Sequence, residues 1–251
     1  MRKFWNIFYS QFVLVDKIGL YSYLRYRFAL NGTKLKINIA NHPITVRKGS
    51  PDLGVAISCL NGEFEILRTL LPSDYTGVIV DAGAYIGTAT IALKTIFPNA
   101  KIVIIEPSSA NLEILKLNVM GIENLEIIQG ALTGMHDEIM QLYDRGTGAW
   151  GFTVVPSPED AGYTTPLHTT RCYKLRDLVP NVAEIGLLKL DIEGGERSLL
   201  LNDSETLHKI GIVYAELHDK IIEGCVDHFF EFSRDRILIK DKGEKYLSIK
   251  K

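Results

Sequence analysis

The sequence predicts an α/β protein whose core is a doubly wound, mostly parallel sheet. From Gly77 onward, short apolar runs rich in β-branched residues alternate with segments of helical periodicity. A glycine-containing turn directly follows the first of these runs, as it does in sheets that bind nucleotide-type ligands. The last two apolar runs are joined only by residues 241–244, which is too short for a parallel crossover, so they should pair antiparallel.

The chain before this sheet reads as an appendage. Residues 1–33 have helical periodicity and end near Asn31-Gly32, a suitable C-cap. Residues 34–50 alternate apolar and polar side chains around a turn at 41–43, which predicts a β-hairpin. We therefore expect a helical segment and hairpin over 1–50 and the main domain over 51–251, opening with a helix at 60–71.

The first fifteen residues are rich in aromatic side chains at helical spacing. Asn6, Ser10 and Gln11 interrupt the apolar run, so a signal peptide or a membrane-spanning helix is not expected. The preferred interpretation is a helix that packs on the domain or on a partner. Shallow membrane contact through residues 1–15 is the alternative.

The elements of the sheet domain follow one another at regular spacing. Helices are expected over 88–97 and 111–119, the second capped by Ser108 or Ser109. A long connection with several glycines and prolines precedes Gly186, and a functional loop or a decorative hairpin explains it equally well. The expected strands are 78–80, 101–105, 125–128, 186–190, 212–215, 236–240 and 246–250.

Composition limits the classes of partner. The 251 residues carry a formal net charge of −2, which gives no basic field for nucleic acid. The three cysteines lie far apart and the six histidines are scattered, so neither a disulfide framework nor a zinc site is expected, and we expect no metal. A reducing compartment follows, and the cytoplasm is the expected location. An oligomer is left open.

The strongest local signal is the turn Val80–Gly87. Gly83 permits a tight turn and close approach of a ligand, Gly87 permits close helix packing, and the helix start offers free N–H groups. Glu106 ends the next strand, about 20 residues after this loop, where an acid can accept hydrogen bonds from ribose hydroxyls. Asp81 stands where a dinucleotide-binding loop has its first glycine, and a carboxylate there favours a positively charged cofactor, S-adenosylmethionine, over a pyrophosphate.

A second acidic segment, Leu187–Glu196, ends another apolar strand. Asp191 and Glu193 should lie near the glycine loop, because the carboxyl ends of the strands meet there. Clustered acids could bind a metal, accept a proton or hold the cofactor's amino group. The segment ending in Glu216-Leu217-His218 adds His218 as a possible general base.

On these residues the chain resembles the FkbM-type family of class I S-adenosylmethionine-dependent methyltransferases, which have a Rossmann-like sheet. The resemblance rests on Val80–Gly87, Glu106-Pro107, Leu188–Glu196 and Ala215–His218, with weaker matches at Val46-Arg47 and Ser50–Asp52. It implies a seven-stranded sheet with a terminal antiparallel hairpin and O-methylation of a hydroxyl, often on a glycan or small natural product. The family's acid beside adenine is absent here, so Gln129 or a backbone N–H near Gly130 and Ala131 should substitute.

These observations together predict an S-adenosylmethionine-dependent O-methyltransferase acting on a small-molecule or glycan hydroxyl. Asp191 is the first candidate base, followed by His218 and Glu193. A nicotinamide-dependent oxidoreductase and a non-catalytic binding module are the alternatives. Trp150 and Tyr85 are candidates to line the substrate pocket. The expected cofactor-binding residues are Asp81, Gly83, Ala84, Tyr85, Gly87, Glu106, Pro107, Gln129, Gly130, Ala131 and Asp191.

Overall fold

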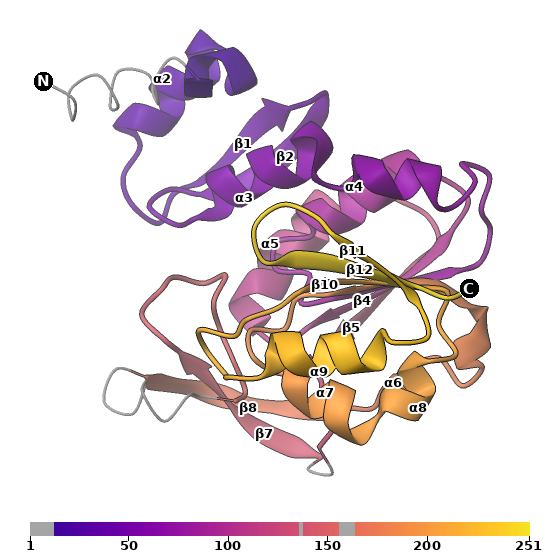
Figure 1. Ribbon diagram of the computed structural model, residues 1–251. Coiled ribbons are helices and arrows are strands. Elements are labelled where there is room, and N and C mark those ends of the chain that lie inside the picture. The colour runs from indigo at the N-terminus through magenta and orange to yellow at the C-terminus, as the bar shows by residue number, and fades with distance from the viewer. Residues whose placement is uncertain (1–12, 136–137, 156–163) are drawn as a thin grey trace, which may run out of the picture.

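The molecule is built around one large sheet covered by helices on both faces (Figure 1). The computed structural model describes residues 13–135, 138–155 and 164–251. The sheet has seven strands in the order β11-β12-β10-β9-β3-β4-β5, and β12 runs antiparallel to β10 and β11. The predicted mostly parallel sheet with a terminal antiparallel pair is confirmed. Its strands are β3 (Val78–Ala82), β4 (Lys101–Glu106), β5 (Leu125–Gln129), β9 (Ile185–Leu190), β10 (Ile212–Glu216), β11 (Ile237–Lys240) and β12 (Lys245–Ile249).

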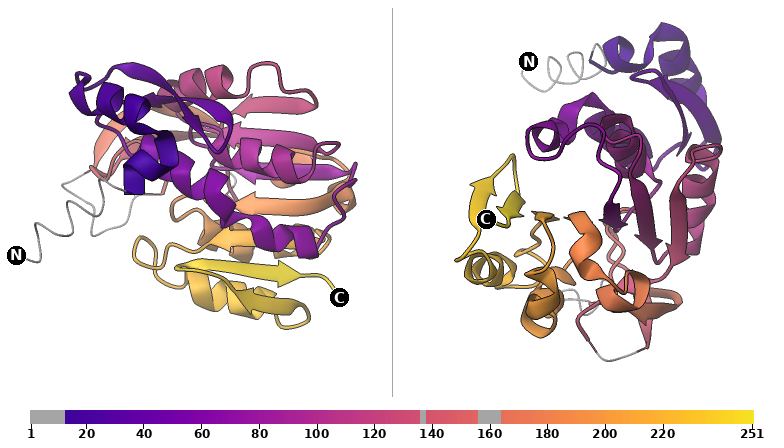
Figure 2. Two further views of the ribbon diagram at one scale, coloured as in Figure 1. Left: turned by 90° about the horizontal axis from the view of Figure 1, so that it is seen from above. Right: turned by 90° about the vertical axis from the view of Figure 1, so that its right-hand side faces the viewer.

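Alternate residues of the buried strands supply two cores, one on each face of the sheet. Ile79 and Ile102 belong to the core that includes residues of α4 and α5, whereas Val80 and Val103 belong to the core on the side of α7, α8 and α9. The two layers are visible on either side of the sheet in Figure 2. The helices are α4 (Thr88–Ile96), α5 (Ser109–Asn118), α6 (Leu175–Leu178), α7 (Glu196–Asn202), α8 (Ser204–Leu207) and α9 (Cys225–Phe232).

The strand order reverses between β3 and β9. From β3 the chain proceeds outward through β4 and β5, and from β9 it proceeds in the opposite direction to β10. Such a switch point leaves an opening at the carboxyl ends of the central strands. Because β4, β9 and β10 end at or just before Glu106, Asp191 and Glu216, the topology brings these carboxylates to one place.

The N-terminal part differs in detail from the prediction. Residues 13–18 are helical and are followed by α2 (Leu20–Phe28), which ends before the predicted cap at Asn31-Gly32. Strands β1 (Lys34–Ile39) and β2 (His42–Arg47) form the expected hairpin. Its turn lies at Ala40-Asn41, both in the left-handed region with φ of 48° and 67°, and not at 41–43. The predictions for residues 1–12 lie outside the described residues.

The predicted helix over 60–71 is wrong. The α-helix of this region is α3 (Asp52–Ser58), and it continues as a π turn (Cys59–Glu63) and a 3₁₀ helix (Glu65–Thr69). Asn61 and Gly62 leave helical geometry, with φ of −108° and 99°, because glycine populates positive φ at little cost. The apolar residues do have helical spacing, but the helix that carries them is broken at Asn61 and Gly62.

The long connection after β5 forms a second, small sheet. Strand β8 (Thr165–Tyr173) pairs in parallel with β6 (Ala131–Leu132) and antiparallel with β7 (Ile139–Asp144). The loop after β7 folds back on this strand, where Thr153 forms an antiparallel bridge with Tyr143. Across the described parts of the chain, no helix combines the length and apolar character that a membrane crossing requires.

Candidate functional site

A cavity of about 230 Å³ lies at the carboxyl ends of the central strands. The glycine loop after β3, the ends of β4 and β9, helix α3 and the loop after β7 all contribute to its wall. Its lining includes Gly83, Glu106, Ala131, Trp150, Asp191 and Glu216. The glycine loop and the acidic ends of β4 and β9 therefore lie together at one cavity, as the sequence predicts.

Gly83 is the point at which the two halves of the sheet touch. It has φ of +76°, and a Cβ placed on it would lie 1.6 Å from the main-chain oxygen of Asp191. A side chain there would force β3 and β9 apart, so the residue must be glycine. Gly87 also has positive φ (82°), but a Cβ there would meet Leu115 of α5, and the residue does not line the cavity. Its role is packing.

Tyr85 holds the glycine loop to the N-terminal part of the chain. Its φ of 53° is costly for a residue with a side chain, so its surroundings must hold it in place. The Tyr85 main-chain N–H donates to Glu106 Oε2 at 2.9 Å, and its hydroxyl donates to Asp52. Asp52 is fully buried and accepts two hydrogen bonds from the Arg47 guanidinium, both of 2.9 Å.

Glu106 is a buried carboxylate with several fixed donors. Its Oε1 accepts from the Ser108 main chain at 2.9 Å and from Asn111 Nδ2 at 3.1 Å. Arg47 Nη2 donates to the Asn111 amide oxygen at 3.0 Å. Two chains of hydrogen bonds therefore connect Arg47 to Glu106, one through Asn111 and the other through Asp52 and Tyr85. Burial raises the pKa of Glu106 to about 7, although these hydrogen bonds oppose the shift. A carboxylate has about four acceptor positions, so capacity remains for a ligand hydroxyl in the cavity.

Lys189 pairs with acids on both sides of the glycine loop. Its Nζ lies 3.3 Å from Asp81 Oδ1 and 3.4 Å from Asp191 Oδ2, and it donates to the Gly83 oxygen at 2.8 Å. Burial alone would lower the pKa of Lys189, but the charges of Asp81 and Asp191 raise it above its ordinary value. Asp81 also accepts from Thr90 Oγ1 at 2.6 Å and is fully buried. Asp81 therefore faces Lys189, and it does not line the cavity.

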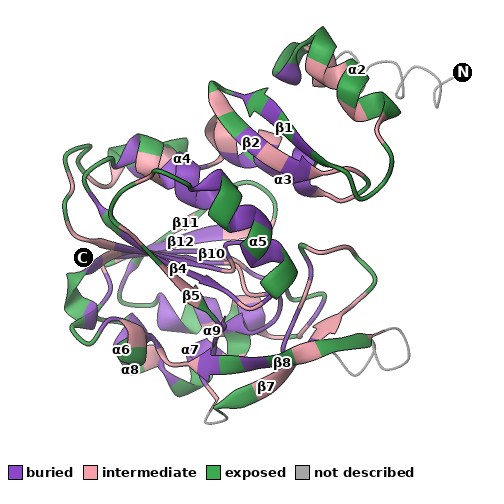
Figure 3. Cartoon of the chain, turned by 180° about the vertical axis from the view of Figure 1, so that it is seen from behind, coloured by how far each residue is buried: buried purple, intermediate pink, exposed green. Residues whose placement is uncertain are grey.

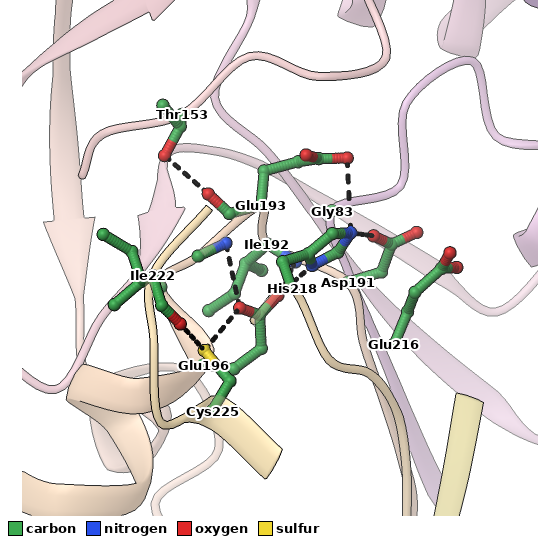
Figure 4. Close-up of polar contacts among 12 residues, drawn as sticks. Gly83, Thr153, Asp191, Ile192, Glu193, Glu196, Glu216, His218, Ile222 and Cys225 are labelled. Carbon is green, nitrogen blue, oxygen red and sulfur yellow. Dashed lines mark hydrogen bonds and ion pairs between the residues drawn. The ribbon is translucent and has the colours of Figure 1, made fainter. Parts of the chain in front are cut away.

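A histidine sits among three acids on the other side of Asp191 (Figure 4). His218 Nδ1 lies 2.9 Å from Glu196 Oε1, and its Nε2 lies 3.8 Å from Asp191 Oδ1 and 3.6 Å from Glu193 Oε1. Burial alone would lower the pKa of His218, but the hydrogen bond to Glu196 and the nearby acids raise it to about 10. Burial raises the pKa of Glu193 to about 8. His218 is thus a cation at neutral pH that holds the acids together.

The same cluster has side chains of metal-ligating type. Asp191, Glu193 and His218 each offer one ligand atom, and these atoms lie within 4.8 Å of one another. Carboxylate and imidazole groups suit several divalent ions. The expectation that the protein uses no metal stays a prediction.

The loop after β7 covers one side of the cavity. Asn111 Nδ2 donates to the Ala149 oxygen at 2.9 Å, and Thr153 Oγ1 donates to the Glu193 oxygen at 2.7 Å. Trp150, which is 45% exposed, and Phe152 line the cavity between these anchors. The reading of the long connection as a functional loop is therefore favoured over a decorative hairpin.

Most of the predicted site residues line the cavity, and four of them do not. Asp81, Gly87, Gln129 and His218 do not line the cavity. Gln129 is exposed at the end of β5, so the neighbouring Gly130 and Ala131 form that wall. The predicted residues that do line it are Gly83, Ala84, Tyr85, Glu106, Pro107, Gly130, Ala131, Asp191 and Glu193.

Sequence reasoning missed the residues that hold these side chains in place. Lys189 carried a readable signal, because a lysine inside the apolar run Leu187–Leu190 must be paired if the strand is buried. Asp52 lies in one of the weaker family matches, which assigned it no role, and Asn111 gave no comparable signal, since it lies in a polar stretch typical of a helix start. Only the fold shows that they meet at Tyr85 and Glu106.

The fold and the acidic cavity define a methyltransferase of the class I type. Residues 81–246 match the model of the methyltransferase FkbM domain, and the chain belongs to this family. No curated protein gives a significant match.

Similar solved structures are also methyltransferases. A candidate caffeoyl-CoA O-methyltransferase from Staphylococcus aureus shares 10% identity, with 75% of this chain and 83% of that one covered and a TM-score of 0.46. An rRNA methylase from Streptococcus thermophilus shares 13% identity, covering 74% and 91%, with a TM-score of 0.43. Precorrin-6y C5,15-methyltransferase from Geobacter metallireducens shares 13%, covering 74% and 86%, with a TM-score of 0.42. At these values the matches say nothing about the acceptor of this chain.

Proposed function

We propose that this protein is an S-adenosylmethionine-dependent O-methyltransferase whose acceptor is a hydroxyl on a glycan or small natural product. One observation carries the proposal: the carboxylates of Glu106 and Asp191 face a single cavity on either side of Gly83. S-adenosylmethionine carries two ribose hydroxyls next to its adenine and, further along the molecule, a sulfonium and an ammonium, so it suits a cavity lined by acids at two separate places.

The residues around the cavity fit such a cofactor. Glu106 would accept from a ribose hydroxyl, because it lines the cavity and its three hydrogen bonds leave about one of its four acceptor positions free. Pro107, Ala131 and Leu132 give an apolar wall beside it, which suits the flat adenine. Gly83 and Asp191 would lie against the methionine part. Asp81 would not contact the cofactor itself; it would fix the position of Lys189, which in turn donates to the Gly83 oxygen.

Asp191 is the proposed proton acceptor. Its side chain is 29% exposed at the cavity, whereas those of Glu193 and His218 are each 7% exposed. When bound, the cofactor would supply a methyl group that moves from its positively charged sulfur to the acceptor oxygen, with the C–S bond breaking and S-adenosylhomocysteine leaving as the neutral thioether. Asp191 takes the hydroxyl proton, a role that contributes about 10²–10⁴-fold in rate. Orientation of the acceptor by the cavity contributes roughly 7–11 kcal/mol in well-aligned reactions.

His218 is proposed as a positioning residue. It cannot accept a proton at neutral pH while its pKa is raised to about 10. Its bond to the buried Glu196 fixes the ring, and Nε2 of the fixed ring then lies beside both Asp191, at 3.8 Å, and Glu193, at 3.6 Å. Glu196 is itself fixed, since it accepts from the main chains of Ile192 at 3.0 Å and Gly194 at 2.9 Å.

The proposal is tested with two variants that should fail in different ways. Glu106→Gln should weaken S-adenosylhomocysteine binding by roughly 10- to 100-fold, because a charged acceptor is lost. Asp191→Asn should leave binding measurable, although weaker than in wild type, but lower kcat at saturating cofactor by about 10²–10⁴-fold. Calorimetry measures the first effect and single-turnover methyl transfer the second. The exposed Glu123→Gln is the matched control.

Two outcomes would contradict the proposal. If wild-type protein were stabilised in thermal melts by a nicotinamide dinucleotide and not by S-adenosylmethionine, the oxidoreductase alternative would replace it. If neither cofactor raised the melting temperature, the protein would be a non-catalytic binding module.

A further inference from the structure

Helix α2 lies at one end of the molecule and is largely exposed (Figure 3), and several of its exposed side chains are apolar. Four side chains at positions i, i+1, i+4 and i+8 of the helix form one stripe, which a helix of about 3.6 residues per turn places on one side. Their exposed fractions are 60% for Leu20, 74% for Tyr21, 43% for Leu24 and 79% for Phe28. Leu30, just beyond the helix, is 81% exposed.

The opposite side of the helix packs against the rest of the molecule. Tyr23 and Tyr26 pack against the core that contains the hairpin, and Lys48 Nζ lies 4.2 Å from the centre of the Tyr26 ring. The exposed stripe is therefore a second apolar face that internal packing does not explain. Within the part of the chain that the structure describes, none of its members lies in a core cluster.

The charged side chains of α2 have one sign. The helix carries two arginines, Arg25 and Arg27, and no aspartate or glutamate. At about 3.6 residues per turn, Arg25 borders the stripe beside Tyr21 and Arg27 borders it beside Leu20. The Arg25 guanidinium lies 5.6 Å from the centre of the Tyr21 ring, which confirms the first placement.

We propose that α2 docks on an anionic lipid bilayer. An interfacial helix places leucine and aromatic side chains at the acyl boundary, while flanking arginines contact anionic headgroups. A symmetric contact between two copies would instead bring Arg25 and Arg27 of both chains together, which like charges oppose. A nine-residue helix is also about 14 Å long, which is small for a stable dimer interface of about 800 Å² per partner.

Vesicle flotation of the full chain tests the proposal. We expect binding to phosphatidylcholine vesicles that contain about 30% phosphatidylglycerol, little binding to pure phosphatidylcholine, and loss of binding at high salt. Leu24→Gln with Phe28→Gln should weaken the partition coefficient at least tenfold. The matched control is Leu117→Gln with Met120→Gln, since these side chains are 44% and 74% exposed in a different region. Arg25→Gln with Arg27→Gln should reduce both binding and its salt dependence.

S-adenosylhomocysteine binding and the melting temperature should be unchanged in all these variants, which separates a failed docking surface from a misfolded protein or a wrong cofactor. Equal binding of wild type to neutral and anionic vesicles would overturn the proposal. So would full binding by the Leu24 and Phe28 double variant. A wild-type dimer in light scattering that this variant converts to monomer would show that a second copy covers the face.

Discussion

At the scale of single residues, the site depends on charges that are buried in pairs. Lys189 and Asp81 are almost completely removed from water in the middle of the sheet. A buried ion pair need not add stability over apolar residues of similar size, but removing one partner leaves an uncompensated charge. Removing one partner should therefore destabilise the protein more than removing both.

Lys189→Met alone should therefore lower the free energy of unfolding by about 3–5 kcal/mol. Adding Asp81→Asn to it should restore part of that loss, because the orphaned carboxylate is removed. Urea unfolding followed by circular dichroism measures both. If the two single effects simply added in the double variant, Lys189 and Asp81 would not be coupled.

At the scale of elements, α3 lines part of the cavity, and Arg47 of the N-terminal hairpin supports it from outside the lining. Arg47 ends β2 and Asp52 begins α3, and together they hold the Tyr85 hydroxyl and the Asn111 amide. The N-terminal hairpin and α3, which precede the main sheet in the chain, thus fix the loop that carries Tyr85 and the end of β4 at Glu106. Burial would raise the pKa of Asp52, but its hydrogen bonds from Arg47 and Tyr85 lower it.

Breaking this network should weaken cofactor binding more than it slows chemistry. Arg47→Met and Tyr85→Phe should each raise the Kd for S-adenosylhomocysteine about tenfold, with kcat at saturating cofactor changed little. Arg47→Lys should rescue only part of the affinity, since lysine does not make the two-pronged contact with a carboxylate. The exposed Arg68→Met is the control. A fall in kcat at unchanged Kd would contradict this assignment.

At the scale of the whole molecule, stability should depend on the acid–histidine cluster. The folded-state pKa of His218 is raised from 6.5 to about 10, so its contribution is complete below pH 6.5 and is lost as pH rises toward 10. Glu193 keeps its proton in the folded state up to about pH 8, whereas it releases it near 4.5 when unfolded. Both groups make the native state lose stability as pH rises.

The free energy of unfolding should therefore decline between pH 6.5 and 8.5, by up to about 1.4 kcal/mol per pH unit for each proton involved. His218→Gln should flatten this decline, whereas His228→Gln on α9 should leave it unchanged. Denaturant titrations at a series of pH values measure the slopes. Identical slopes in wild type and His218→Gln would rule out the raised pKa of His218.

The sheet was predictable from the sequence because each strand is a short apolar run bounded by turn residues, and periodicity reports burial directly. The carboxylates at the strand ends were predictable for the same reason, since topology fixes where parallel strands end. The helix at 60–71 was misplaced because Asn61 and Gly62 leave helical geometry and break the helix there, while the apolar spacing continues across the kink. The partners of Tyr85 and Glu106 were not predictable, because contacts between distant polar residues leave no periodic pattern.

The small sheet β6–β8 meets the main fold at a few defined points, among them the Thr153 contact with the Glu193 main chain. The part of the cavity that would hold the nucleoside is lined by residues that follow β3 and β4, whereas Trp150 and Phe152 come from the loop after β7. Under the proposed function, substitutions in this loop should change which acceptor fits, while the residues proposed to hold the methyl donor keep their places.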